Sequence, residues 1–412
     1  MRPDTLEILR CPYCGGRLEV VTSSFHKREG DEIVDAILGC HCCVFPVVAG
    51  IPVVHLEPAA VAARALVETG DTARAARKMF APDDDLRAEQ FEKAAASPTA
   101  TYRRLIDALG PGFEGGYFLY RFSDPTYVVA DAVVRAVAGT VVRQRGRAID
   151  VCGGSGHLTR SLLDCSGSAP VVVDQSFAKL WLARRFTAPG CEPICCDGNA
   201  PLPFVKQAFE LVVCSDAFHY IWTKRLLASE MMRVAAPDGA VVVTHAHNAN
   251  QWNPSAGMPL PPDAYGDLFA EMNPRLFAER DLLREIVGGG PLDLSRHDAS
   301  EALDADLALT IVASHRADVF RSYPATPAVG ARGEFRVNPL YEVEGNGDRV
   351  RLRLRFPSEE YEQEYGAARN YLAEDIVVDR IALAALPAEQ LPATLTDLAR
   401  RRVILDLPKR YY

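Results

Sequence analysis

Short β-branched runs alternate with helical patterns between residues 147 and 314, and this alternation limits the possible folds more than any other feature. Each run ends near a polar residue, and the segments between the runs have apolar residues at helical spacing. Strand–helix–strand units place their strands parallel in one sheet. The sequence therefore predicts an α/β domain with a mostly parallel sheet, from the runs RAIDVC, APVVVDQ, EPICCD, FELVVCSD and GAVVVTHA.

Three other segments flank this alternation. Residues 1–57 contain two cysteine pairs, and residues 58–130 have helical patterns. The last segment contains an EGNGD turn followed by RVRLRLRF, in which arginines and apolar residues alternate as in a half-exposed strand. We expect a metal-stapled module over 1–57, a helical linker or cap over 58–130, the α/β domain over 131–317 and a small α+β, β-rich appendage over 318–412. The ending ARRRVILDLPKRYY is typical of a solvated terminus.

The composition limits the class of protein. The chain has 412 residues, of which 48% are hydrophobic and 24% charged, as in soluble globular proteins with several domains. The formal net charge of -9 argues against a protein that mainly binds nucleic-acid phosphates. No apolar run reaches the roughly 18 residues of a membrane span, and the first residues lack the apolar core of a secretion signal. Its 11 cysteines favour thiols or metal ligands in a cytoplasmic protein.

The loop AIDVCGGSGHL follows the first of these strands. A dinucleotide fingerprint, G-x-G-x-x-G, would begin at Gly154 and include Gly156, but its third position is Thr159. The phosphate loop also fails, because no lysine follows the glycines. Asp150, at the end of the strand, would repel a pyrophosphate and attract a cationic group. The loop therefore predicts a ligand with cationic groups that lies close to the backbone.

Two further acids stand at later strand ends. Asp174 ends the second strand, where a carboxylate can accept hydrogen bonds from both ribose hydroxyls. Asp197 ends the third strand, where it can accept from the exocyclic amine of adenine. Together with Asp150 near an ammonium and sulfonium, these acids describe a site for S-adenosylmethionine.

Residues 147–245 resemble the class I S-adenosylmethionine-dependent methyltransferases. The motifs AIDVCGGSGHL, VVVDQS, CCDGNAPLPF, FELVVCSDAFHYI and RVAAPDGAVVV occur in the order and at the spacing of that family. The family loop is D/E-x-G-x-G-x-G, and Cys152 stands at its first glycine. The resemblance implies a Rossmann-like fold and S-adenosylmethionine as cofactor. It assigns to the cofactor Asp150, Cys152, Gly153, Gly154, Gly156, Asp174, Gln175, Asp197, Gly198, Ser215 and Asp216.

The cysteine pairs CPYC and CHCC in residues 1–57 predict a metal site. Two C-x2-C pairs can supply the four thiolates of a tetrahedral zinc, and a site with no open position is structural. A segment of this size also needs such a cross-link to fold. The predicted ligands are Cys11, Cys14, Cys40 and Cys43; His41 and Cys42 are possible substitutes, and four buried thiols without metal are the alternative.

Residues 5–55 resemble the small zinc-ribbon activator subunit of tRNA, rRNA and protein methyltransferases. The resemblance rests on LEILRCPYCGGRLEV and GCHCCVFPVVAGIPVV, with Val44 where the family has a glycine. In that family a free subunit docks on a methyltransferase. The resemblance implies that this ribbon docks on its own methyltransferase domain or on that of a dimer mate.

The fourth strand ends in CSDAFHYIW, where the methyltransferase family places the acceptor. The N/D-P-P-Y motif for planar nitrogens is absent there, and so is a Pro-Cys nucleophile. His219 is the main candidate for a general base because imidazole titrates near neutral pH, and His245 is the second. Each histidine has a purely structural role as its alternative. The spacing does not support a metal held by Asp216 and two histidines.

These features predict methyl transfer from S-adenosylmethionine to an oxygen or nitrogen of a small molecule, a sugar or another metabolite, as in specialised metabolism. One alternative is an rRNA, tRNA or translation-factor methyltransferase with a fused activator ribbon. Another is a non-catalytic module that binds the cofactor and a partner. Acids outnumber Lys and Arg in residues 1–57, which disfavours RNA and favours a small-molecule acceptor.

Overall fold

The computed structural model is described over most of the chain. The described residues are 1–110, 115–253, 257–325, 332–345, 347–384, 386, 391 and 393–412. Within them, no helix combines the length and the apolar character that crossing a bilayer requires.

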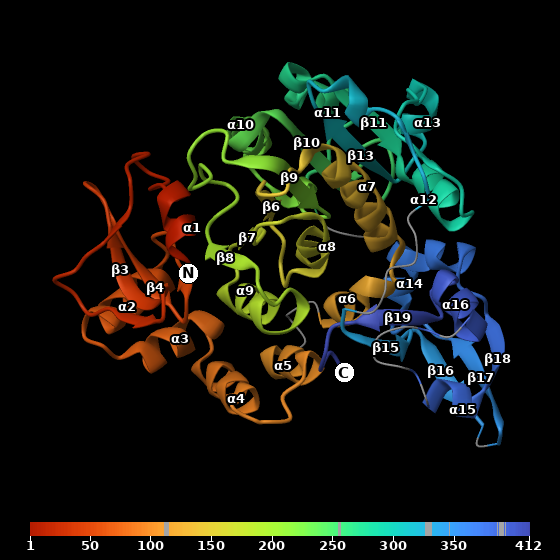
Figure 1. Cartoon of the computed structure of the whole chain (residues 1–412), viewed down its shortest axis with the longest axis horizontal. Helices are drawn as coiled ribbons and strands as arrows, with labels where there is room; N and C mark the ends of the chain where they lie inside the picture. The colour runs from red at the N-terminus through yellow and green to blue at the C-terminus, as the bar shows by residue number, and fades with distance from the viewer. Residues whose placement is uncertain are drawn as a thin grey trace.

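A seven-stranded sheet forms the centre of the molecule (Figure 1). Its strands are β6 (Ala148–Val151), β7 (Val171–Asp174), β8 (Glu192–Cys195), β9 (Phe209–Ser215), β10 (Ala235–His247), β11 (Pro274–Ala278) and β13 (Ala308–Ala313). Their order in space is β11-β13-β10-β9-β6-β7-β8. Strands β6 to β10 are parallel, and β13 is antiparallel to both of its neighbours. The predicted α/β fold with a mostly parallel sheet is confirmed.

Helices cover both faces of this sheet. They are α7 (Pro125–Val141), α8 (His157–Cys165), α9 (Phe177–Leu182), α10 (Lys224–Val234), α11 (Pro262–Leu268) and α12 (Glu279–Val287). Alternate residues of β9 face opposite layers: Val212 packs with α10 and α11, whereas Leu211 and Val213 pack with α7, α8 and α12. The chain passes from β6 outward to β8 and then returns to β9. Ligands bind at the carboxyl ends of the strands near such a switch in strand order.

The N-terminal module (residues 1–57) lies against the β8 edge of the central sheet (Figure 1). It contains α1 (Pro3–Ile8), β1 (Glu19–Val20), β2 (Lys27–Glu29), β3 (Glu32–Gly39), β4 (Val44–Val48) and β5 (Ile51–Pro52). Val53 forms a parallel bridge with Cys195, and the Val54 N–H donates to the Cys195 carbonyl at 2.8 Å. The module therefore covers the otherwise open edge of the sheet, within the same chain.

The segment after this module is helical, as the sequence predicts. Its helices are α2 (Pro58–Glu68), α3 (Thr72–Phe80), α4 (Asp85–Ala95), α5 (Tyr102–Leu109) and α6 (Gly115–Tyr120). Side-chain oxygens of Asp71, Asp84 and Thr101 accept backbone N–H groups at the first turns of α3, α4 and α5. These N-caps explain where the three helices begin.

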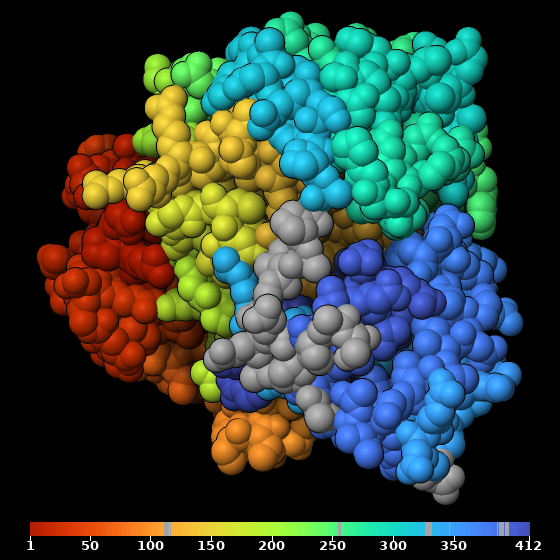
Figure 2. Space-filling model, turned by 45° about the vertical axis from the view of Figure 1, so that its right-hand side comes forward, coloured from red at the N-terminus to blue at the C-terminus, as the bar shows by residue number. Residues whose placement is uncertain are grey.

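The C-terminal appendage (residues 318–412) lies on the opposite flank of the central domain from the N-terminal module (Figures 1 and 2). Its main elements are β15 (Glu334–Val337), β16 (Tyr341–Glu344), β17 (Arg349–Leu354), α14 (Glu359–Tyr365), β18 (Asp375–Asp379), α15 (Arg380–Ala384), α16 (Ala393–Arg400) and β19 (Ile404–Leu407). Along β17, the exposed Arg349 and Arg351 and the half-buried Arg353 alternate with buried apolar residues, as RVRLRLRF predicts. Strands β16 and β17 form the expected hairpin, although Asn346 of its EGNGD turn lies outside the described residues.

The expectation of a solvated terminus is wrong for the last residues. Tyr411 is buried, and its hydroxyl donates to the Phe118 carbonyl at 2.7 Å and lies 2.7 Å from Nε2 of His157. Arg400, Arg401, Lys409 and Arg410 are exposed, whereas Arg402 donates to the Phe122 carbonyl at 2.6 Å. The ring of Tyr411 lies between α6 and the start of α8. The end of the appendage therefore supports the helix that follows the glycine loop.

Candidate functional site

The glycine loop, residues 152–156, turns sharply between β6 and α8. Cys152, Gly154 and Gly156 have positive φ angles of 58°, 54° and 77°. A Cβ on Gly153 would lie 2.6 Å from the Asp150 carboxyl carbon, so only glycine fits there. Cys152 adopts the left-handed conformation at about 1 kcal/mol of strain. The loop therefore has, at Cys152, a left-handed backbone that a glycine would adopt without strain.

Asp150 lies buried beneath this loop. One carboxylate oxygen accepts from the Thr159 hydroxyl at 2.7 Å. The other oxygen has no hydrogen-bond partner among the described residues. Burial raises the pKa of Asp150 to about 7. A cationic group beside the free oxygen would favour the charged carboxylate.

Asp174 connects the end of β7 to the glycine loop. Its two carboxylate oxygens accept from the Gly154 N–H at 3.0 Å and the Ser176 N–H at 2.8 Å. Gln175, the next residue, points toward the N-terminal module and donates to Glu57 at 2.5 Å. The Asp174 side chain therefore holds the loop while facing the same space as Asp150.

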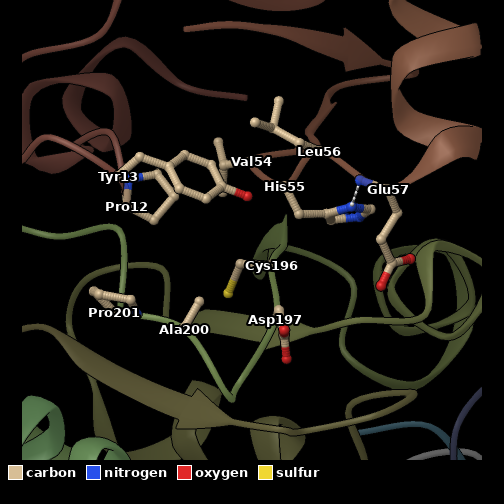
Figure 3. Close-up of a pocket in the computed structure, with 10 residues that line it drawn as sticks. All are labelled: Pro12, Tyr13, Val54, His55, Leu56, Glu57, Cys196, Asp197, Ala200 and Pro201. Atoms are coloured by element: carbon tan, nitrogen blue, oxygen red, sulfur yellow. Dashed lines mark hydrogen bonds between the residues drawn. The ribbon is translucent and has the colours of Figure 1, made fainter. Parts of the chain in front are cut away.

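A main cavity of about 330 Å³ lies at the carboxyl ends of β6, β7 and β9. Seven of the residues that the sequence assigns to the cofactor line it: Asp150, Cys152, Gly153, Gly154, Asp174, Ser215 and Asp216. Gly156, Gln175 and Gly198 do not line it. Asp197 lines a second cavity, of about 240 Å³, beside the N-terminal module (Figure 3).

A further group of side chains lines the main cavity and could not be recognised from the sequence. Tyr117 of α6 donates to the Asp216 carboxylate at 2.8 Å, and Arg121 lies 3.1 Å from the same carboxylate. Tyr365 of α14 also lines the cavity. Burial raises the pKa of Asp216, but the charges of His245 and Arg121 outweigh burial and lower it below its ordinary value. An ionised carboxylate is thus fixed at the end of β9.

The candidate bases His219 and His245 do not line the main cavity. The His219 ring stacks on that of His247 with centroids 3.5 Å apart, and burial lowers the pKa of His219 to about 4. His245 pairs with Glu279 at 2.8 Å. Burial opposes the charge of His245, but Asp216 and Glu279 raise its pKa to about 9. The general-base roles of both histidines stay predictions.

Asp216, His219 and His247 bring possible ligand atoms within 4.8 Å of one another. The two imidazole planes are nearly parallel, at 12°. A metal near two stacked rings would lie outside both ring planes, whereas an imidazole nitrogen binds metal in its plane. The orientation of the two rings therefore does not suit a metal shared by both histidines.

Replacing Glu279 by glutamine is expected to make stability less dependent on pH. Since the folded pKa of His245 is about 9 and its ordinary value is 6.5, its stabilisation is complete below pH 6.5 and disappears as pH rises through 9. The variant should lose roughly 2 kcal/mol of unfolding free energy near pH 6 and much less above pH 9. Urea unfolding at both pH values measures this, and a loss that is equal at both would contradict it. Glutamine can still accept from the His245 N–H and the Thr310 hydroxyl.

Four cysteine sulfurs of the N-terminal module cluster within 4.8 Å of one another. Three Sγ–Sγ distances, Cys11–Cys42, Cys14–Cys40 and Cys40–Cys42, are each 3.7 Å. Four sulfurs about 2.3 Å from a central zinc lie about 3.8 Å apart. The cluster therefore fits tetrahedral zinc, but with Cys42 in the place predicted for Cys43. Cys43 Sγ lies 3.4 Å from Cys42 Sγ, next to the cluster.

Comparison with known proteins identifies the central part of the chain. Residues 148–239 match the family model of a methyltransferase domain. Over 145 residues the chain is 34% identical to the malonyl-[acyl-carrier protein] O-methyltransferase of Halorhodospira halophila. The matched segment covers 34% of this chain and 46% of that protein. The chain thus spans less than half the length of this curated relative.

Solved structures with low identity also superpose on the chain. The YcgJ protein of Bacillus subtilis is 16% identical and covers 45% of this chain and 98% of its own, with a TM-score of 0.32. A chain from the complex of the Haloferax volcanii Trm112 methyltransferase activator with a methyltransferase is 17% identical, with a TM-score of 0.32. The superposition covers 45% of this chain and 90% of that one. These values give no basis for transferring a ligand or a partner. The family match, on the segment that carries the glycine loop and the strand ends, shows that residues 148–239 are a methyltransferase domain.

Proposed function

We propose that this chain transfers the methyl group of S-adenosylmethionine to an oxygen or nitrogen of a small-molecule acceptor. The observation that carries the proposal is the row of acids Asp150, Asp174 and Asp197 at the carboxyl ends of three adjacent parallel strands. Two of them face the main cavity and the third faces the second cavity. The methyltransferase family match over the same strands supports it.

The residues of the site fit the parts of this cofactor. The free oxygen of Asp150 suits the ammonium end, Asp174 the ribose and Asp197 the base. Gly153 and Gly154 let the backbone approach the ligand closely. The bound cofactor would supply an electrophilic methyl group on its sulfonium. The protein then has to hold an acceptor in line with that methyl group and keep water away, which can supply several kcal/mol.

The acceptor would occupy the part of the main cavity beyond the glycine loop. Tyr117, Tyr220 and Tyr365 line this part together with Asp216. The ionised Asp216 can accept a hydrogen bond from an acceptor hydroxyl or amine, and so orient it. Because α6 and α14 both contribute to the wall, the space favours a compact acceptor over a nucleic acid. The curated relative is named for O-methylation of malonyl-[acyl-carrier protein], which is not a nucleic acid.

Zinc is proposed as a second, structural cofactor of the N-terminal module. Cys11, Cys14, Cys40 and Cys42 would hold it, because their sulfurs have the spacing of a tetrahedral site. Four thiolates leave no open position, so the metal would have no role in methyl transfer.

Calorimetry and methyl-transfer assays on the full chain test the proposed function. We expect S-adenosylmethionine and S-adenosylhomocysteine to bind with one-to-one stoichiometry. Radiolabelled methyl groups should enter the small-molecule fraction of a cell extract and not its RNA. No detectable binding would overturn the proposal, and label in RNA would overturn the acceptor class.

A further inference from the structure

We propose that the N-terminal module forms one wall of the adenine subsite, with Tyr13 and Leu56 packing against the base. This inference rests on the proposed function. It adds that the cofactor site is incomplete without residues 1–57, so the module takes part in binding directly.

The second cavity lies between two parts of the chain that are distant in sequence (Figure 3). One wall comes from the loop after β8. The other comes from the N-terminal module, and Figure 3 shows Tyr13 and Leu56 on that side of the cavity. The lining residues are Cys196, Asp197, Ala200 and Pro201 on the first wall and Pro12, Tyr13, Val54, His55, Leu56 and Glu57 on the second.

The second cavity is lined by partly exposed apolar side chains, against which a purine can pack. Tyr13 is 52% exposed and Leu56 is 47% exposed, and both adjoin a cavity that the buried residues Val54 and Cys196 also line. A planar base in this cavity would cover the exposed apolar surface of Tyr13 and Leu56 on the wall from the N-terminal module. Stacking of a base on an aromatic ring is favourable for any base.

Asp197 adds a polar group to this apolar surface. Its Oδ1 accepts from the backbone N–H and the side-chain amide of Asn199. No described residue forms a hydrogen bond with its Oδ2 in the structure. A carboxylate oxygen is an acceptor for the exocyclic amine that adenine carries.

The main cavity lies at the ends of β6, β7 and β9, and the second cavity lies at the loop after β8, one strand further along the same edge of the sheet. Strand β7 pairs with β6 on one side and with β8 on the other, so Asp174 lies between Asp150 and Asp197. A Cβ on Gly198 would come within 3.0 Å of Cys152 Sγ, which places the Asp197 loop against the glycine loop. On the side of the module, Glu57 binds Gln175, the neighbour of Asp174. A ligand with its cationic end at Asp150 and its ribose at Asp174 would therefore place its base in the second cavity.

The cysteine cluster lies next to the adenine subsite along the chain. Pro12 and Tyr13 lie between two of the clustered cysteines, Cys11 and Cys14. A metal bound by these cysteines would fix the loop that carries Tyr13 against the cavity.

Calorimetric titration of the full chain with S-adenosylhomocysteine tests the inference. Replacing Tyr13 by alanine should weaken binding about tenfold, and Tyr13→Phe should keep the wild-type affinity, because the ring and not its hydroxyl contacts the base. Leu56→Ala should weaken binding several-fold. Phe25→Ala, an exposed aromatic of the same module outside the cavity, is the matched control and should have no effect.

A second ligand separates stacking on the base from general loosening of the site. S-ribosylhomocysteine lacks adenine, so Tyr13→Ala should leave its affinity unchanged. Metal content and melting temperature are measured for each variant; if Tyr13→Ala loses metal, Leu56→Ala decides, since it lies outside the cysteine loop. Unchanged affinity in Leu56→Ala and in a folded Tyr13→Ala variant would overturn this inference and leave the proposed function standing. If the wild-type chain binds no S-adenosylhomocysteine, the proposed function itself fails.

Discussion

Replacing Asp174 by alanine is expected to weaken binding of S-adenosylmethionine by about 30-fold or more. The carboxylate would accept two charge-assisted hydrogen bonds from the ribose, worth at least about 2 kcal/mol together. It also accepts the Gly154 N–H at 3.0 Å, so its removal loosens the glycine loop at the same time. Titration calorimetry of the variant against the wild-type chain measures the effect.

Two control variants separate the loss of the ribose contacts from a general effect of removing a charge. Asp238→Ala removes the same charge from a side chain that is 72% exposed, and it should leave the affinity unchanged. Asp174→Asn keeps one oxygen to accept the Gly154 N–H but loses the charge, so its affinity should fall between those of the other two chains. An unchanged dissociation constant for Asp174→Ala would contradict the cofactor assignment.

The central sheet and its acids could be predicted because the evidence for them is local. Each strand is a short β-branched run, and an acid at its end lies at one edge because parallel strands end together. The sequence alone could therefore place Asp150, Cys152 and Asp174 around one cavity. It also showed the missing glycine at Cys152, but only the structure shows that the cysteine adopts a φ of 58°.

The acceptor side of the main cavity could not be predicted in the same way. Tyr117, Arg121 and Tyr365 come from α6, the turn after it and α14, which tertiary packing brings to the end of β9. No local pattern marks an arginine that is 5% exposed between two acids. The burial of Tyr411 depends equally on contacts with distant segments.

The histidines show a different limit of sequence reasoning. Titration near neutral pH made His219 and His245 candidates, but the protein environment decides both their charge and their access. His245 has a positive φ of 53° at an irregularity in β10, and its ring turns to Glu279. The main cavity is lined instead by Asp216, which the sequence analysis assigned to the cofactor.

The second large effect is expected at the cysteine cluster. Replacing Cys42 by serine should release the metal and cost the N-terminal module several kcal/mol of stability, because metal binding and folding are coupled in modules of this size. The melting transition of the module should fall by about 10 °C or more. Metal analysis after dialysis, together with thermal unfolding followed by circular dichroism, measures both effects.

Cys43→Ser is the matched control because Cys43 is the next residue and its sulfur lies 3.4 Å from that of Cys42. It should retain one equivalent of zinc and the wild-type melting temperature. The opposite result, metal lost only in Cys43→Ser, would restore the C-x2-C spacing that the sequence favours. If both variants kept the metal, Cys42 and Cys43 would be interchangeable as the fourth ligand, and the assignment of Cys42 would be contradicted. Both Cys42 and Cys43 follow β3, but the Cys42 Sγ lies 3.7 Å from the Sγ atoms of both Cys11 and Cys40. This distance is close to the sulfur–sulfur separation in a tetrahedral zinc site, so Cys42 is the expected ligand.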